Sequence, residues 1–493
     1  MHVNWKAVGF IMAAAGWFVF AEDPPLPLGL GASERARTPE PALPAGLAAP
    51  SSEPSLPAGL AAPPQPSSAE PALPSGLGAP QVEAAGLAAP SERRLPEFLS
   101  GFWEARAGVR LQKAVNEKEA SLGETRLQLR IDESGDRAAV RIVSDFLYDP
   151  VLNDPDIDLE DGDGWLDLRQ ANLLLRPAPF MDVKLGRQIN TWGTGDLLFI
   201  NDLFPKDWNA FFIGRDDEYL KAPSDAAKSS IFSDWLNLDL VYTPRFDADR
   251  SIDGRRLSYW NGRRLVGRNG TVDADKPDET FRDDEWAARL YRSLGAYEVA
   301  AYAYDGFWKS PGGVDALTGK AIYPRLQVFG GSLRGPLGKG ILSLEGGWYR
   351  SADDRNGDDP FVRNSEARYL VGYEQELLRN LTGGIQYYVE SMRNYGAYRR
   401  SLPPGLVASD ENRHVVTVRL TRLLMSQNLR AGIFVYYSPS DRDAYLRPNV
   451  TYKLDDHWTA EAGGNVFIGE RDTTFFGQFE ENNNLYASLR YGF

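Results

Sequence analysis

The sequence predicts an all-β protein, a transmembrane antiparallel β-barrel of about 18 strands that occupies residues 98–493. Three observations carry this prediction: a two-residue alternation of apolar and polar side chains, tight turns that alternate with long polar loops, and an N-terminal segment typical of secreted chains. The mean hydropathy of −0.38 is too polar for a bundle of membrane helices, which need about 20 consecutive apolar residues each.

Composition narrows the classes of function. The 493-residue chain has 54 basic and 68 acidic side chains, so its net charge of −14 argues against a nucleic-acid partner. It has no cysteine and only three histidines, which leaves little material for a metal site or a cofactor, and we expect neither. His414 stands beside Arg413 without a recognisable nucleophile motif, so we expect no enzyme. The acidic run at residues 154–164 misses the EF-hand spacing and is interpreted as a solvated outer loop.

Residues 1–21 have the layout of a cleaved signal peptide. Lys6 precedes a 15-residue apolar run at residues 7–21, and Ala21 is followed at once by Glu22 and Asp23. The run is too short to span a bilayer comfortably, so we expect a mature chain that starts near Glu22.

Residues 22–97 are predicted to be a disordered, Pro/Ala/Gly-rich tether in the periplasm. Seventeen of the 33 prolines lie there, and no aromatic residue occurs between Phe20 and Phe98. Three copies of one motif recur, as EPALPAGLAAP at 40–50, EPSLPAGLAAP at 53–63 and EPALPSGLGAP at 70–80. The repeats are either a spacer or short linear ligands that present Leu-Pro-x-Gly-Leu to a periplasmic partner.

Alternation runs through the rest of the chain. At residues 127–132, 416–421 and 429–436, apolar side chains fall on one face and mostly polar ones on the other. A soluble sandwich has the same period. The aromatic residues at strand ends indicate a membrane barrel instead, because interfacial girdles require them. They include Trp286, Trp348, Tyr373, Tyr437 and Trp458.

Strand parity sets the count. Seventeen strands can be placed. Counted from both ends of the barrel, the short turns fall on one rim, except that one strand is missing from this count between Gly193 and Asp283. An even barrel needs one more strand there, and residues 256–260 are the favoured position. The prediction is therefore 18 strands, with 16 as the fallback.

The last strand carries a resemblance. Residues 485–493 read LYASLRYGF, with apolar residues at every second position and a terminal Phe493. This ending resembles the assembly signal of Gram-negative outer-membrane barrels. The resemblance implies a chain that lies in outer-membrane lipid after its last strand is read by the barrel-assembly machinery.

Charged side chains are predicted to point into the lumen. Among the inward positions, eight basic residues face five acidic ones, a surplus that favours anionic solutes. The alternative is that these charges pair across the lumen and stiffen a plugged barrel. The predicted pore-lining residues are Arg126, Arg130, Lys184, Arg368, Glu390, Arg419, Arg430 and Arg447.

Residues 193–233 form an unusually long insertion rich in aromatics and charges. It is predicted to fold inward and narrow the pore, or otherwise to cap the outer mouth. The preceding Gly186-Arg187-Gln188 and Trp192-Gly193 resemble a feature of porin-like outer-membrane families, including the alginate-export type. Strict alternation puts Arg187 on the lipid side, unless a bulge re-aims it or it lies at the rim. The predicted constriction residues are Trp192, Asp196, Asp202, Lys206, Arg215, Asp216 and Asp217.

These observations predict an outer-membrane channel for small or polymeric hydrophilic solutes that are anionic or polyhydroxylated. One alternative is the outer component of an export system, docked to its periplasmic partner through the Leu-Pro-x-Gly-Leu repeats. Another is a structural barrel that sheaths an electron-transfer partner, which would have to be a separate chain.

Overall fold

The computed structural model describes residues 96–493 except 115, 153, 405 and 407. The predicted signal peptide at 1–21 and nearly all of the tether at 22–97 lie outside the described residues. The described residues from Pro96 to Phe493 belong to one compact unit.

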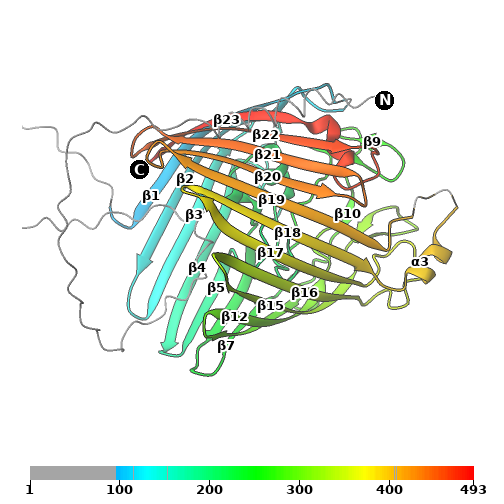
Figure 1. Ribbon diagram of the computed structural model, residues 1–493, viewed down its shortest axis with the longest axis horizontal. Coiled ribbons are helices and arrows are strands. Elements are labelled where there is room, and N and C mark those ends of the chain that lie inside the picture. Colours follow the sequence, from blue (N-terminus) through cyan, green and yellow to red (C-terminus); the bar gives the residue numbers. More distant parts are fainter. Residues whose placement is uncertain (1–95, 115, 153, 405, 407) are drawn as a thin grey trace, which may run out of the picture. The chain divides into compact units, whose positions relative to one another are not determined.

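Eighteen antiparallel strands make one sheet, and the sheet closes on itself (Figure 1). Closure occurs where β1 and β23 pair, from Phe102 opposite Gly492 to Arg110 opposite Asn484. The barrel and the predicted count of 18 are thus confirmed. Its strands are β1 (Leu99–Arg110), β2 (Ala120–Ser134), β3 (Ala138–Tyr148), β4 (Leu166–Ala178), β5 (Met181–Gln188), β6 (Ser224–Ile231), β7 (Asn237–Thr243), β11 (Glu285–Leu294), β12 (Tyr297–Phe307), β15 (Arg325–Leu337), β16 (Gly340–Ser351), β17 (Glu366–Leu378), β18 (Leu381–Met392), β19 (Asn412–Leu424), β20 (Leu429–Ser438), β21 (Asp443–Lys453), β22 (Trp458–Gly469) and β23 (Asn484–Gly492).

The eighteenth strand is not where the sequence predicted it. It is β6 (Ser224–Ile231), which pairs with β5 and β7, so the predicted constriction segment 193–233 includes a wall strand. Residues 256–260 instead contribute β8 (Tyr259–Trp260), which pairs with β9 (Leu265–Val266) outside the barrel. The prediction was wrong because residues 224–231 read SDAAKSSI and show almost no apolar face, whereas residues 259–260 are aromatic.

The two rims of the barrel differ. Short turns join the strands at the rim where β1 begins and β23 ends, for example between Leu294 and Tyr297 and between Leu337 and Gly340. Every long connection lies at the opposite rim, as in outer-membrane barrels. These loops carry the minor elements β10 (Ala274–Asp275), β13 (Gly313–Val314), β14 (Ala321–Ile322), α3 (Tyr395–Ser401) and η2 (Gly477–Asn482).

The outer face of the barrel is apolar, whereas the inner face carries most of the charged side chains together with a buried aromatic core that packs against residues 192–220. Outward side chains such as Trp286, Phe329, Val371 and Ile385 are each at least half exposed. Such a continuous apolar surface belongs in lipid. Among the described residues, the helices are all too short to cross a membrane.

Candidate functional site

The connection between β5 and β6, residues 189–223, lies inside the barrel and is called the insertion. It contains the short helix α2 (Trp208–Ile213) and the 3₁₀ turn η1 (Asp217–Leu220). Its first part contacts β16–β20, and its last part contacts the opposite wall around β21–β23 and β1–β4. The insertion therefore crosses the lumen and is held at both sides.

Local sequence explains the compact turn at the centre of the insertion. Asp207 caps α2 by accepting a hydrogen bond from the Ala210 N–H at 2.7 Å. Gly214 ends the helix in a left-handed conformation with φ of 88°. A Cβ at Gly214 would lie 2.2 Å from the Tyr486 ring of β23, so only glycine lets the helix end approach this wall.

One carboxylate of β16 holds the first part of the insertion. Glu345 is buried and accepts five hydrogen bonds. The donors are the Thr194 N–H at 2.7 Å and its hydroxyl at 3.0 Å, the Gly195 N–H at 3.1 Å, and the Asn201 N–H at 2.8 Å and its amide at 3.0 Å. Three of these donors are backbone groups that would otherwise be unsatisfied away from water, so Glu345 fixes the path of the main chain.

Asp196 connects the same part of the insertion to the next strands. Arg419 of β19 donates to both of its carboxylate oxygens, at 2.5 and 2.9 Å. Gln386 of β18 accepts from the Asp196 N–H at 2.7 Å and donates to its carbonyl at 2.8 Å. The Arg419–Asp196 pair remains partly exposed, so solvent weakens it relative to the buried contacts of Glu345.

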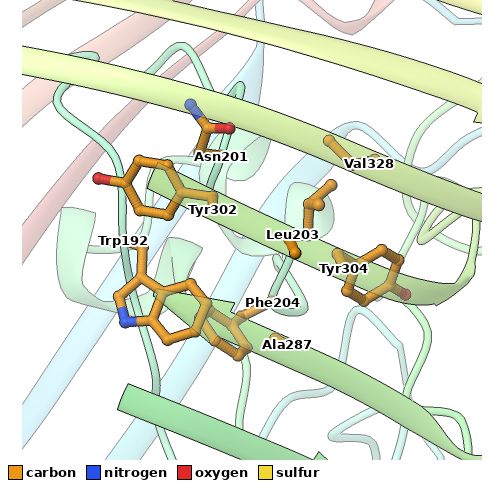
Figure 2. Close-up of a pocket in the computed structure, with 9 residues that line it drawn as sticks. Trp192, Asn201, Leu203, Phe204, Ala287, Tyr302, Tyr304 and Val328 are labelled. Atoms are coloured by element: carbon orange, nitrogen blue, oxygen red, sulfur yellow. The ribbon is translucent and has the colours of Figure 1, made fainter. Parts of the chain in front are cut away.

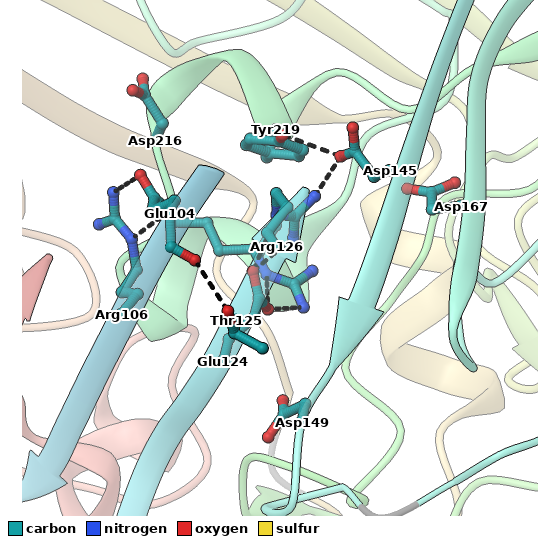
Figure 3. A network of polar contacts seen from close by, with 12 residues as sticks. Glu104, Arg106, Glu124, Thr125, Arg126, Asp145, Asp149, Asp167, Asp216 and Tyr219 are labelled. Carbon is teal, nitrogen blue, oxygen red and sulfur yellow. Dashed lines mark hydrogen bonds and ion pairs between the residues drawn. The ribbon is translucent and has the colours of Figure 1, made fainter. Parts of the chain in front are cut away.

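The opposite wall holds the last part of the insertion through a buried ionic network (Figure 3). Arg126 of β2 is about 1% exposed and ion-pairs with Glu124 at 2.6 Å and with Asp145 of β3. Arg215 of the insertion ion-pairs with the other oxygen of Glu124 at 2.6 Å. The Tyr219 hydroxyl donates to Asp145 at 2.8 Å, and its ring lies 4.0 Å from the Arg126 guanidinium. Each charge in this network therefore has an opposite charge or a donor beside it.

Further contacts extend that network to the seam of the barrel. Arg447 of β21 ion-pairs with Asp217 and donates to the Arg215 carbonyl at 2.7 Å. Asp216 lies 3.3 Å from Arg490 of β23. These pairs hold Asp216 and Asp217, at the start of η1, against β23 and β21.

The remaining predicted constriction residues lie within the insertion itself. Lys206 donates to Asp202 at 2.9 Å, and both side chains are buried. Trp192 packs edge-on against Phe204 at 4.9 Å and lies near Tyr302 of β12 (Figure 2). These contacts order this part of the insertion and place the two rings beside β11, β12 and β15.

A second long connection, residues 244–284 between β7 and β11, covers the insertion from the long-loop side. Arg250 ion-pairs with Asp167 of β4 at 2.9 Å and with Asp207 at 3.5 Å. Asp249 accepts from the Lys206 N–H at 2.8 Å. A cavity of about 90 Å³ with lining charges of both signs lies beside these contacts. Burial raises the pKa of the Asp163 carboxyl at this cavity, against the attraction of Arg255.

Two predicted pore residues, Arg368 and Glu390, belong to one cluster of ion pairs rather than facing open lumen. Arg368 ion-pairs with Glu366 of the same strand and lies 3.8 Å from Glu390 of β18. Glu390 also pairs with Arg363 at 3.2 Å. With Arg126, Arg419 and Arg447, at least five of the eight predicted pore-lining residues are in ion pairs.

The other three, Arg130, Lys184 and Arg430, lie toward the short-turn rim. Lys184 of β5 stands directly opposite Lys228 of β6, and the alternation of both strands points the two side chains inward. Arg430 is the second residue of β20, and Arg130 is half solvated at the end of β2. These three and Lys228 are called the basic vestibule.

Arg187 lies on the outer side of β5, as strict alternation requires, but at the long-loop rim. It is buried there because it ion-pairs with Asp225 at 2.9 Å and donates to the Leu168 carbonyl at 2.6 Å and to the Leu159 carbonyl of the outer loop. Gly186 beside it has a φ of 108°, a conformation that suits glycine.

Several residues of the site were missed from the sequence as anchors. Glu345 was an inward position without an assigned partner, and Glu124, Asp145, Tyr219 and Arg250 were not singled out. The inward acids Glu124 and Asp145 follow the same alternation as Arg126, so parity could have placed them in the lumen. Their contacts with the insertion could not be read from parity, because they join segments about 70 to 90 residues apart.

No family model and no curated protein matches this chain. Among solved structures it is similar to OccD3 (OpdP) of Pseudomonas aeruginosa, with 10% identity, 80% of this chain and 91% of that chain covered, and a TM-score of 0.46. It is also similar to OccK11 (OpdR) of Pseudomonas aeruginosa, with 11% identity, 80% and 95% covered, and a TM-score of 0.47. A third similar structure is OccAB1 of Acinetobacter baumannii, with 10% identity, 80% of this chain and 95% of that chain covered, and a TM-score of 0.46. Similarity this distant does not identify a solute. The class defined by the geometry is an 18-stranded transmembrane barrel with an inward insertion.

Proposed function

We propose that the protein is an outer-membrane channel for small hydrophilic solutes, with a preference for anionic or polyhydroxylated ones. The observation that carries this proposal is a closed membrane barrel whose interior carries many charged side chains and is narrowed by a segment of the same chain. A barrel that served only as a structural body would need its apolar core but not the buried charges around it, because each buried charge has to be paired. Here several of the pairs hold the insertion, and the basic vestibule lies below it.

The vestibule supports the anion preference. Lys184 and Lys228 are cross-strand neighbours, and both side chains point into the lumen. Asp239 is 3.9 Å from Lys228, but it also accepts the Ser230 hydroxyl at 2.6 Å. A water-filled lumen tolerates this pair and uses it to attract anions.

The insertion argues against a sheath around an electron-transfer partner. Because it is anchored on opposite walls, another protein could thread the lumen only after displacing the Glu345 contacts and the Arg126 network. A polymeric solute meets the same obstacle. Small solutes are therefore favoured within the channel class.

The export alternative rests on the repeats at residues 40–80 and involves another part of the chain. Three copies of Leu-Pro-x-Gly-Leu offer repeated binding to one periplasmic partner, and repetition raises avidity without new contacts. Channel activity in pure lipid does not need such a partner, so the two proposals are separable by experiment.

Planar-bilayer recording of the purified protein tests the channel proposal. In a salt gradient, the reversal potential should show anion preference, and Lys228→Glu combined with Arg430→Glu should weaken or invert it. Neither side chain bonds to the insertion in the described structure, so its anchors stay intact. Absence of conductance, or cation preference in the unmodified protein, contradicts the proposal.

A further inference from the structure

The outer surface of β15–β18 carries a row of basic side chains at the long-loop rim. Arg350 is the outward residue opposite Gln327 of β15. Arg393 directly follows β18 and donates its backbone N–H to the Ser365 carbonyl at 2.7 Å. These strands are neighbours in the sheet, and they end beside α3 in Figure 1.

A row of aromatic and small residues lies one outward position closer to the middle of the barrel. Trp348 of β16 is 42% exposed and stands opposite Phe329 of β15 and Ala367 of β17. The Arg393 guanidinium lies 5.1 Å from the Trp348 ring centroid, and Ala367 is almost fully buried although it faces outward. Aromatics next to arginines at a rim are typical of the boundary between hydrocarbon and headgroups.

Neither guanidinium is neutralised by this part of the protein. Among the described residues, no carboxylate forms an ion pair with Arg350 or Arg393, and Arg350 makes only a 3.4 Å hydrogen bond to the Gln327 amide oxygen. The acids around them have other partners. Asp305 accepts from the Gln327 amide at 2.7 Å, and Asp353 accepts from the Arg325 N–H at 2.7 Å.

Other outward arginines on the strands differ in position or partner. Arg187 is buried and paired with Asp225, and Arg325, next to the row, is 3.7 Å from Asp283. Arg292 and Arg422 lie at the short-turn rim. Arg350 and Arg393, two outward arginines without a carboxylate partner, thus lie together in one sector of the long-loop rim.

We propose that Arg350 and Arg393, above the Trp348 and Phe329 rings, bind the phosphorylated headgroup of an outer-leaflet lipid. Guanidinium groups bind phosphate through paired, charge-assisted hydrogen bonds. The two arginines are separated by about two strand spacings, roughly 10 Å, so a headgroup with two phosphates engages both. Its acyl chains lie along Phe329, Tyr369 and Val371, which are all strongly exposed on the same face.

This inference rests on the location in an outer membrane but not on conductance. The test uses the full-length protein purified in detergent and titrated with bisphosphorylated lipid A, with binding followed by native mass spectrometry. Arg350→Ala with Arg393→Ala should weaken lipid binding by about tenfold or more, because charged hydrogen bonds to phosphate are lost. Arg292→Ala, which removes an outward arginine at the other rim, should leave it unchanged.

Three outcomes overturn the proposal. They are equal lipid affinity of the double variant and the unmodified protein, an equal loss in Arg292→Ala, and displacement of the lipid by millimolar inorganic phosphate, which would indicate a site for free phosphate. The unmodified protein should bind monophosphorylated lipid A more weakly than the bisphosphorylated form. The double variant should bind the two forms with equal affinity. Each variant is first checked for heat-modifiable gel migration, which shows that its barrel is folded. Conductance is recorded separately, so loss of the channel proposal and loss of the lipid site give different results.

Discussion

The two walls that hold the insertion do so by different chemistry. On β16–β20, one carboxylate gathers mainly backbone donors, and the Arg419–Asp196 pair beside it is partly exposed. On the seam side, Arg126, Glu124, Asp145 and Arg215 form a buried network in which the charges depend on one another.

This difference assigns separate roles to the two ends of the insertion. Removing one partner of a buried network leaves an uncompensated charge, which costs about 3–5 kcal/mol, whereas partly exposed pairs contribute about 1 kcal/mol or less. The seam side therefore stabilises the barrel. The β16–β20 side sets the position of the insertion at a lower cost and is the side at which the width of the pore can be changed.

The largest expected effect is on stability. Arg126→Met leaves Glu124 and Asp145 without their shared guanidinium, so we expect the free energy of unfolding to fall by about 3–5 kcal/mol. Urea unfolding in lipid vesicles measures it.

The matched control for this variant is Arg141→Met, which removes one partner of the exposed Arg141–Asp132 pair on the same part of the barrel. It should cost about 1 kcal/mol or less. Equal losses in the two variants would show that the seam network is not the stabilising region.

The next effect is on conductance. Glu345→Gln removes the negative charge that accepts five hydrogen bonds from the insertion. It also places the N–H donors of an amide opposite the donors of the insertion. We expect a higher and noisier single-channel conductance with the barrel still folded. Glu298→Gln, on the neighbouring wall but bonded to Arg289 and not to the insertion, should leave conductance close to that of the unmodified protein.

A smaller effect of the same kind should follow Asp196→Asn. The variant weakens the Arg419 ion pair but keeps the backbone hydrogen bonds to Gln386. Conductance should rise less than in Glu345→Gln. A larger rise than in Glu345→Gln would reverse the ranking of the two anchors on this wall.

The smallest effect is expected from deleting residues 23–89, because all eighteen strands of the barrel sheet lie between Leu99 and Gly492. Membrane insertion and conductance in pure lipid should be unchanged. If the repeats are ligands, the same deletion should abolish transport in cells, whereas unchanged transport would leave only the spacer interpretation.

Sequence patterns predicted the barrel because alternation, turns and terminal strand all depend on local composition. Seventeen strands and the total of 18 could be placed in this way, with the inward direction of residues such as Arg126 and Arg419. The position of β6 could not, because its Ser, Ala and Lys residues lack the apolar face that marks a strand.

The site was harder to predict for a different reason. The charge count of eight basic to five acidic inward residues omitted acids such as Glu104, Glu124 and Asp145, and it could not show which charges are paired. The pairing of Glu345 with Thr194, or of Arg447 with Asp217, depends on how the insertion folds across the lumen. Such long-range contacts carry no signal in a single sequence.

The most direct test of a polar lumen uses the absence of cysteine from the chain. Arg430 points inward, and Ala431, one residue along β20, points outward. Arg430→Cys and Ala431→Cys are each recorded in planar bilayers before and after a charged, membrane-impermeant thiol reagent is added. The account predicts that modification lowers the current through Arg430→Cys and leaves that through Ala431→Cys unchanged. A block at Ala431→Cys with none at Arg430→Cys, or no current through either, would contradict it.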